Sequence, residues 1–188
     1  MILYIHGFAS CGDSTKTRLL KAYFGEEEVL APDVPVEPDA AMSFLRRLIG
    51  TEAVTLIVGS SLGGFYATAL SAEYRIDAVL INPSVHPYQT LAPCVGTNTF
   101  WCSGEPFEWE SVYLLQLARM AEAMQLPEAN LLVLLQTGDE VLDYAVAEEV
   151  YRGYEVVVET GGNHRFENLG DYLVRIARFY RRAEAASQ

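Results

Sequence analysis

The chain has 188 residues, 51% of them hydrophobic, which suits one well-packed domain and is too short for two. Its formal net charge is −12, because 25 acidic residues outnumber 13 basic ones. An acidic protein of this kind repels polyanions, so the charge argues against nucleic acid as a partner.

Short apolar runs alternate with segments of helical periodicity along the whole chain. The expected strands cover residues 1–5, 28–34, 54–58, 77–81, 130–136 and 154–159. The expected helices cover residues 15–24, 38–49, 62–74, 143–151 and 167–182. Strands that are apolar on both faces and alternate with helices predict an α/β fold, in which a parallel sheet has helices on both faces.

Loops that could carry chemistry follow five of the expected strands. They are His6-Gly7, Ser60-Ser61, Asn82-Pro83, Gly138-Asp139 and residues 161–164. In an open parallel sheet, ligands bind at the carboxyl ends of the strands. These loops are therefore expected to meet at one edge of the sheet.

One long connection, residues 84–111, interrupts the alternation and is rich in aromatic residues. A connection of this length in a compact domain is usually functional or disordered, and the aromatic content argues against disorder. We interpret it as a lid or pocket wall inserted into a single domain that spans residues 1–188. Its Trp101, Trp109 and His86 are candidate substrate-binding residues, although His86 could equally be exposed.

Three cysteines occur, at Cys11, Cys94 and Cys102. Their odd number and the lack of a C-x-x-C spacing argue against a disulfide framework and a zinc site, so we expect neither metal nor cofactor. The chain starts without a signal-peptide pattern, and its apolar runs are too short to span a membrane. The expected location is cytoplasmic, with no membrane contact.

The segment Gly59-Ser60-Ser61-Leu62-Gly63 fits the G-x-S-x-G pattern of a nucleophile elbow, with Ser61 at its centre. An expected strand precedes it and an expected helix follows, as the elbow requires. Ser60 fits worse, because it lacks glycines two residues to either side. The competing interpretation is a turn of small residues where a helix packs on a strand.

A nucleophilic serine needs a base, and the base needs a carboxylate to orient it. In hydrolases with this elbow the order along the chain is Ser, then Asp or Glu, then His. His164 follows the last expected strand and is the predicted base. Asp139, Glu140 and Asp143 follow the strand before it. We assign Asp139 as the acid, with Asp143 as the alternative, although Asp143 is better placed to cap the next helix.

Two backbone N–H groups are predicted to form the oxyanion hole. One belongs to Leu62, which follows the serine at a helix N-terminus, and the other to Phe8, in the loop after the first strand. His6 in the same loop is interpreted as structural, holding the loop by a hydrogen bond.

The segments "YIHGF", "GSSLGGFYA", "INPSVHPY", "QTGDEVLDY" and "GGNHRFENL" together resemble the small bacterial esterases of the YqiA-like branch of the α/β-hydrolase superfamily. The resemblance runs from residue 1 to about residue 180. It implies a three-layer fold with six parallel strands in the order 2-1-3-4-5-6. It also implies that Ser61, Asp139 and His164 are the triad.

The predicted function is hydrolysis of carboxylic esters through this triad and an acyl-enzyme intermediate. One alternative is an acyl-CoA thioesterase that uses the same triad. The other is a non-catalytic module that binds a small molecule on the same fold, because a fold does not by itself imply activity. The expected partner is a small ester or thioester, bound by a monomer or homodimer.

Overall fold

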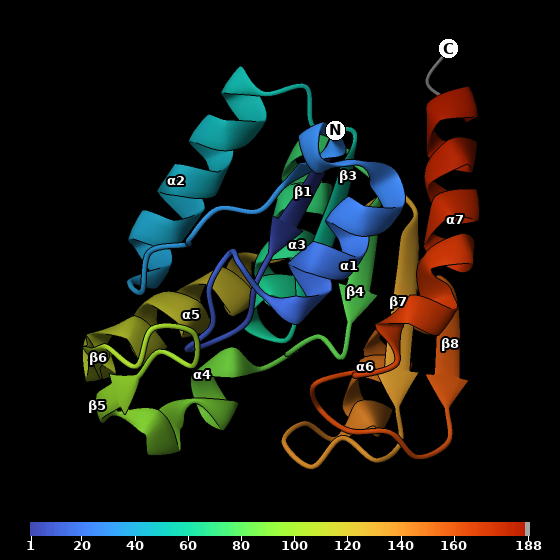
Figure 1. The fold of residues 1–188 in the computed structure, drawn as a ribbon. Helices are drawn as coiled ribbons and strands as arrows, with labels where there is room; N and C mark the ends of the chain where they lie inside the picture. Colours follow the sequence, from blue (N-terminus) through green and yellow to red (C-terminus); the bar gives the residue numbers. More distant parts are fainter. Residues whose placement is uncertain (187–188) are drawn as a thin grey trace.

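The computed structural model describes residues 1–186, and side chains as far as residue 181. Within this part, six parallel strands form one sheet in the order β2-β1-β3-β4-β7-β8 (Figure 1). The strands are β1 (Ile2–Ile5), β2 (Val29–Leu30), β3 (Leu56–Ser60), β4 (Ala78–Ile81), β7 (Leu131–Gln136) and β8 (Glu155–Glu159). Numbered along the chain within this sheet, the order is 2-1-3-4-5-6, which confirms the prediction.

Seven α-helices are described in residues 1–186. They are α1 (Thr15–Phe24), α2 (Pro38–Thr51), α3 (Leu62–Tyr74), α4 (Pro87–Thr90), α5 (Ser111–Ala123), α6 (Tyr144–Val150) and α7 (Leu173–Ala186). Local signals in the sequence explain where several of them begin. Pro38 occupies the first turn of α2, and the side chain of Ser14 caps α1 by accepting the backbone N–H of Thr17.

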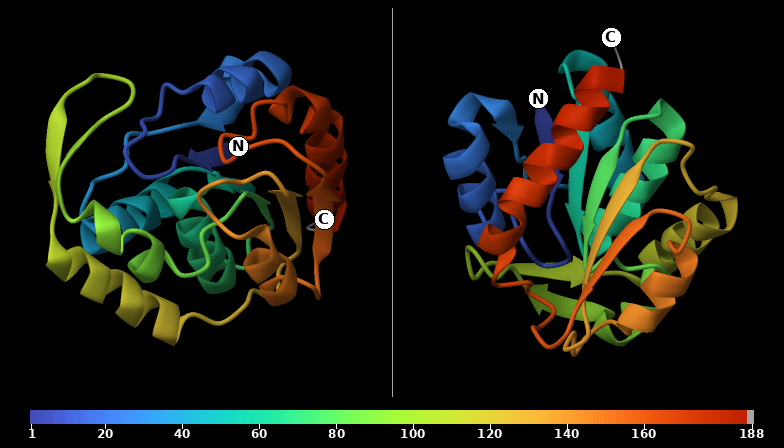
Figure 2. Two further views of the ribbon diagram at one scale, coloured as in Figure 1. Left: turned by 90° about the horizontal axis from the view of Figure 1, so that it is seen from below. Right: turned by 90° about the vertical axis from the view of Figure 1, so that its right-hand side faces the viewer.

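Helices cover both faces of the sheet, because side chains alternate between the faces along each strand. In β1, Ile2 and Tyr4 pack in the same cluster as Leu20 of α1 and Ile176 of α7. Leu3 and Ile5 face the opposite layer, which consists of α2, α3, α5 and α6. The right-hand view of Figure 2 shows the sheet between these two layers.

The strand β2 is shorter than predicted. The sequence predicted a strand over residues 28–34, whereas the observed strand covers only Val29–Leu30. Pro32 and Pro35 have no backbone N–H to donate to a neighbouring strand, so pairing stops early. Asp33 instead accepts the backbone N–H of Gly12 at 2.7 Å, which ties this segment to the loop after β1.

The segment 84–111 contains regular structure that the sequence did not predict. After α4 it forms an antiparallel hairpin of β5 (Gly96–Thr99) and β6 (Pro106–Trp109), separate from the main sheet. The tip of the hairpin lies on the loop after β1, because the backbone N–H of Trp101 donates to the carbonyl of Ala9 at 2.9 Å.

The sequence argued against a disulfide framework, but the structure contains one disulfide. Cys11 and Cys102 are paired as a disulfide, with their Cα atoms 6.4 Å apart, and Cys94 is free. An odd number of cysteines does not exclude one pair, and 91 residues separate these two in the chain. Only the fold, which places the hairpin on the loop after β1, brings them together. The disulfide therefore fastens the 84–111 segment to that loop.

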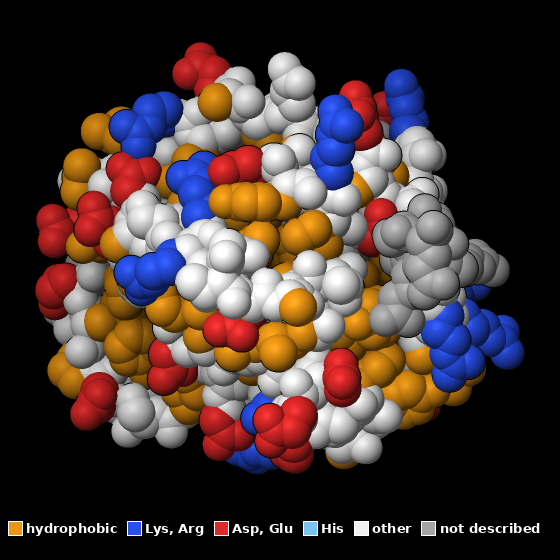
Figure 3. Space-filling model, turned by 90° about the horizontal axis from the view of Figure 1, so that it is seen from above, with side chains coloured by type: hydrophobic (Ala, Val, Ile, Leu, Met, Phe, Trp, Pro, Cys, Tyr) orange, Lys and Arg blue, Asp and Glu red, His pale blue; other side chains and the backbone are white. Residues whose placement is uncertain are grey.

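The carboxyl ends of the strands face the lower side of the molecule in Figure 1, together with α4 and the hairpin. The loops after β7 and β8 lie on this side as well. Figure 3 looks onto the opposite face, where acidic and basic side chains are interspersed with apolar ones. The loops that the sequence singled out therefore share one end of the sheet.

Replacing Gly63 with Ala should strongly destabilise the fold. A Cβ at Gly63 would overlap the carbonyl oxygen of Ile5 and lie 2.6 Å from that of His6, and neither backbone group can move away easily. We expect the free energy of unfolding to fall by about 3 kcal/mol, measured by urea denaturation. Gly50→Ala is the matched control, because a Cβ at Gly50 in α2 meets nothing within 4 Å. It should stabilise the protein by about 0.5–1 kcal/mol, and equal effects of the two changes would contradict this account.

Candidate active site

Ser61 lies in a sharp turn between β3 and α3. Its backbone has φ 54° and ψ −120°. Residues that carry a side chain rarely adopt such a positive φ. The turn is possible because glycines lie on both sides of it. A Cβ at Gly59 would be 2.7 Å from the Cβ of Ala67 in α3, and one at Gly63 would collide with the carbonyl of Ile5. Such strain is typical of a serine that a strand-to-helix turn projects above the sheet.

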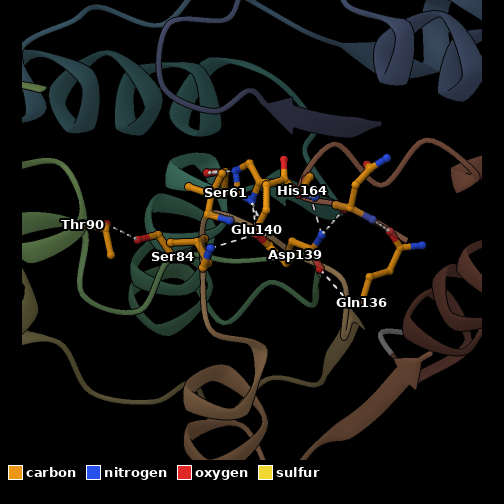
Figure 4. A network of polar contacts seen from close by, with 11 residues as sticks. Ser61, Ser84, Thr90, Gln136, Asp139, Glu140 and His164 are labelled. Atoms are coloured by element: carbon orange, nitrogen blue, oxygen red, sulfur yellow. Dashed lines mark hydrogen bonds and ion pairs between the residues drawn. The ribbon is translucent and has the colours of Figure 1, made fainter. Parts of the chain in front are cut away.

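The side chains of Ser61, His164 and Asp139 form a chain of hydrogen bonds (Figure 4). The Nε2 atom of His164 is 3.0 Å from Oγ of Ser61. The Nδ1 atom of His164 is 2.8 and 3.0 Å from the two carboxylate oxygens of Asp139. A proton on Nδ1 that points to the carboxylate leaves Nε2 free to accept the serine proton.

Asp139 is a buried carboxylate whose lone pairs are satisfied. Its side chain is 2% exposed, against 19% for that of His164. Its Oδ1 atom also accepts the backbone N–H groups of Val141 at 2.9 Å and Leu142 at 2.8 Å. Asp143, the alternative acid, instead accepts the N–H of Ala145 at 3.0 Å and caps α6. The geometry therefore favours Asp139 as the partner of the histidine.

Glu140 has a supporting role that the sequence did not reveal. Its Oε2 atom accepts the backbone N–H of His164 at 3.0 Å. This hydrogen bond is the main cause that lowers the pKa of Glu140, because it stabilises the charged carboxylate. Glu140 thus holds the backbone of the histidine while Asp139, the residue before it, holds the ring.

Two side-chain amides, those of Asn82 and Gln136, hold the backbone of the loop that carries His164. The Nδ2 of Asn82, just after β4, donates to the carbonyls of Asn163 at 3.1 Å and His164 at 3.3 Å. Gln136, at the end of β7, accepts the N–H of Asn163 at 3.0 Å. Asn82 also accepts the backbone N–H of Gln136 at 3.0 Å. Their positions at the end of a strand or directly after one were the only sequence signal for this role.

The two predicted oxyanion donors lie against Ser61. Leu62 is the first residue of α3, whose opening N–H groups have no partner within the helix. A Cβ at Gly7 would be 3.1 Å from the Cβ of Ser61, so the loop that carries Phe8 passes directly over the serine. Within residues 1–186, the N–H groups of Phe8 and Leu62 donate to no other residue. Both are thus available to a bound oxygen.

His6 is buried and links two loops. Its Nδ1 lies 2.9 Å from the carbonyl of Gly7, and its Nε2 accepts the N–H of Val34 at 3.0 Å. An Nε2 that accepts a hydrogen bond carries no proton, so the ring is neutral. Burial is the main cause that lowers the pKa of His6 below its usual 6.5.

Protonation of His6 should lower stability in mild acid. The unfolded chain binds this proton near pH 6.5 and the folded chain only at lower pH, so stability falls as the pH drops below 6.5. Urea denaturation between pH 8 and 5.5 should show this loss, with a slope of at most about 1.4 kcal/mol per pH unit. The loss should shrink in His6→Asn and persist in His86→Asn, whose ring is exposed. An identical slope in His6→Asn would contradict this role.

A small cavity of about 30 Å³ lies beside Gly7 and Leu62, the residues next to the serine turn. Its walls include Phe8, Leu62 and Tyr66 on one side and Phe107 and Trp109 of the 84–111 segment on the other. The ring of Phe8 packs edge-on against those of Phe107 and Trp109, with centroids 5.6 and 5.0 Å away. The 84–111 segment thus contributes a wall to this cavity.

The three candidate substrate-binding residues have different positions. Trp109 is 1% exposed and lines the cavity, whereas Trp101 is 77% exposed at the tip of the hairpin. His86 is exposed and precedes α4, where its ring contacts that of Tyr88. Neither Trp101 nor His86 lines this cavity. The structure therefore brings only Trp109 to the wall of the site.

In residues 1–186, no group of three or more His, Cys, Asp or Glu side chains is arranged to hold a metal ion. Over the same residues, no helix combines the length and apolar character needed to cross a membrane.

The sheet order, the strained serine turn and the layers of helices define an α/β-hydrolase fold. Est1E from Butyrivibrio proteoclasticus, solved with ferulic acid bound, has a similar structure, with a TM-score of 0.72 and 15% identity over 98% of this chain and 89% of that one. An esterase domain from a Rhodothermus marinus protein gives a TM-score of 0.66 and 21% identity, covering 94% of this chain and 85% of that one.

The chain belongs to the uncharacterised protein family UPF0227, whose family model matches residues 1–181. A UPF0227 protein of Serratia proteamaculans (strain 568) is 28% identical over 192 residues, which cover 95% of this chain and 98% of the relative. The UPF0227 protein YcfP of Escherichia coli O9:H4 (strain HS) is 26% identical over 187 residues, with the same coverage. These relatives and the similar structures confirm the resemblance that the sequence indicated.

Proposed function

We propose that this protein is a serine hydrolase that cleaves carboxylic esters. The observation that carries the proposal is the hydrogen-bonded series from Ser61 through His164 to Asp139, at 3.0 and 2.8 Å. A serine in a strained elbow, beside two unoccupied backbone donors, is the arrangement that acyl transfer requires. The fold supports the proposal, because the structures similar to this chain include esterases and a lipase.

The proposed reaction has two steps. His164 accepts the proton of Ser61 as its Oγ attacks the ester carbonyl, while the N–H groups of Phe8 and Leu62 stabilise the oxyanion. The alcohol leaves with the proton from His164, and Ser61 keeps the acyl group. Water, activated by His164, then attacks the acyl-enzyme and releases the acid. Asp139 holds the histidine ring and stabilises its positive charge throughout.

We expect oxygen esters to be better substrates than acyl-CoA thioesters, because only a few basic side chains lie near the site. A CoA tail needs free basic side chains for its phosphates, and the candidates are Lys16, Arg18 and Lys21 of the first helix and Arg165, which follows His164. Arg18 is paired with Asp13 at 2.9 Å, and Lys21 with Glu26 at 3.1 Å. Burial is the main cause that lowers the pKa of Lys16 to about 8, so this side chain still carries most of its positive charge at neutral pH.

A substrate panel tests this proposal. The purified protein should hydrolyse short-chain p-nitrophenyl esters, and kcat/KM for each should exceed that for the CoA thioester of the same acyl group. Because only the leaving group differs within a pair, the comparison separates the ester from the thioester interpretation. A higher kcat/KM for the thioesters would favour the alternative, and failure to turn over either set would contradict the proposal.

A further inference from the structure

Two residues that line the cavity each carry a buried polar atom without a hydrogen-bond partner. These atoms are the hydroxyl oxygen of Tyr66, in α3, and the indole Nε1 of Trp109, in β6. Tyr66 is 2% exposed and Trp109 is 1% exposed, so solvent does not satisfy them either. Folded proteins rarely leave a buried donor unpaired, because the group has lost its hydrogen bonds to water. Two such donors around one cavity indicate that a bound small molecule supplies the missing hydrogen-bond acceptor.

The cavity lies beside the reacting atoms of the proposed reaction. Leu62 and Phe8, the proposed oxyanion donors, both line it, as does Gly7, whose Cα faces the side chain of Ser61. His164, which protonates the leaving alcohol in that reaction, does not line it. We therefore assign the position near His164 to the leaving alcohol and the cavity to the acyl group.

The chemistry of the walls defines what the two donors can bind. An indole N–H can only donate, and a phenol O–H can donate, so both can serve an acceptor oxygen. The lining contains no Asp, Glu, Lys or Arg, and His6 is neutral. Burial, with the negative charge of Asp39 as a second cause, raises the pKa of Tyr66 and keeps it protonated. An anionic group would therefore enter without a countercharge, which favours an uncharged oxygen.

We infer that Tyr66 and Trp109 are specificity-determining residues that bind a short acyl group through an uncharged hydroxyl, keto or ether oxygen beyond the ester carbonyl. This inference rests on the proposed esterase function. A volume of about 30 Å³ restricts the cavity to a small group, since a water molecule needs at least about 10–15 Å³. The donors thus select esters of short oxygenated acids over esters of plain alkanoic acids of equal length.

Matched ester pairs test the inference. The p-nitrophenyl esters of methoxyacetic and butanoic acid differ by one oxygen in place of one methylene, as do those of 3-methoxypropanoic and pentanoic acid. Each kcat/KM is divided by the rate of hydroxide hydrolysis, which removes the intrinsic reactivity of the ester. The wild-type protein should prefer the oxygenated member of at least one pair by about tenfold. Tyr66→Phe should reduce that preference about fivefold or more.

Tyr151→Phe is the matched control. Tyr151 is also a buried tyrosine, but its hydroxyl is paired with Oγ1 of Thr68 at 3.0 Å and it does not line the cavity. This variant should keep the wild-type preference. In urea denaturation it should unfold at a lower concentration than wild type, whereas Tyr66→Phe should not, because the Tyr66 hydroxyl has no partner to lose.

The outcomes separate the inference from the function on which it rests. If esters are hydrolysed with no preference in either pair, or if Tyr66→Phe keeps the full preference, the donors serve only cavity water and the inference is wrong. It is equally wrong if Tyr66→Phe lowers the urea midpoint as much as Tyr151→Phe does. If the wild-type protein hydrolyses none of the four esters, the proposed function fails and the inference fails with it.

Discussion

Replacing Ser61 with Ala should reduce kcat/KM for a short-chain p-nitrophenyl ester by about 10⁴-fold or more. The reason is that His164 and Asp139 act only through the serine oxygen, which lies 3.0 Å from Nε2 of the histidine. The small residual rate would come from binding and from the oxyanion donors. Purified variant and wild-type protein should be compared at several enzyme concentrations, with circular dichroism to verify that both are folded.

Ser60→Ala is the matched control for this change. Ser60 precedes Ser61, but it is 5% exposed and ends β3, so its hydroxyl has no path to a substrate in the cavity. Its activity should stay within about tenfold of wild type, which corresponds to roughly 1.4 kcal/mol. If Ser61→Ala retained activity within the same range, Ser61 would not be the nucleophile.

Replacing Asp139 with Asn should reduce kcat/KM by about 10⁴-fold. An amide nitrogen that faces Nδ1 of His164 favours the wrong tautomer of the ring, whose Nε2 then carries the proton and cannot accept one from Ser61. The backbone contacts should survive, because the amide oxygen of the new side chain can still accept the N–H groups of Val141 and Leu142. The melting temperature should therefore change only slightly, although kcat/KM falls by several orders of magnitude.

Asp143→Asn separates the two carboxylates that the sequence left in competition. Asp143 caps α6 through the N–H of Ala145, and Asn caps helices about as well as Asp. Both activity and stability should therefore remain near those of the wild-type protein. A large loss of activity in Asp143→Asn, with activity retained in Asp139→Asn, would reverse the assignment.

Much of the fold was predictable because its signals are local. The strands β1, β4 and β7 read as short apolar runs, since buried parallel strands are apolar on both faces, and the half-exposed edge strand β8 reads as a run of three valines. The predicted bounds of α1 and α3 match the observed Thr15–Phe24 and Leu62–Tyr74. The strand predicted over residues 54–58 is instead Leu56–Ser60, because pairing with β4 continues through Gly59 and Ser60 into the serine turn.

The elements that the sequence missed depend on tertiary contacts. The strand β5 has the sequence GTNT, which has no apolar alternation, and it pairs only with β6. Helix α5 (Ser111–Ala123) buries only Leu117 completely, so its periodicity is weak. The pairing of Cys11 with Cys102 and the contrast between a buried Trp109 and an exposed Trp101 also arise from where the hairpin lies on the loop after β1.

The reacting side chains of the candidate site could be predicted from the sequence. The residues that hold them in position could not. Ser61, Asp139 and His164 could be proposed because each lies in the loop or turn after a strand whose carboxyl end faces one edge of the sheet. The contacts of Asn82 and Gln136 with the histidine loop could not, since they depend on the lateral order of β4 and β7. The unpaired polar atoms of Tyr66 and Trp109 become visible only when the packing around them is known.

The most direct test of the central claim is covalent labelling with a fluorophosphonate, which reacts with an activated serine. We expect intact-protein mass spectrometry to show one adduct, and peptide mapping to place it on Ser61. Ser61→Ala should gain no mass, and His164→Ala should label much more slowly, because the serine loses its base. If the folded wild-type protein gains no adduct, or if Ser61→Ala labels as fast as wild type, Ser61 is not an activated nucleophile and the esterase proposal is wrong.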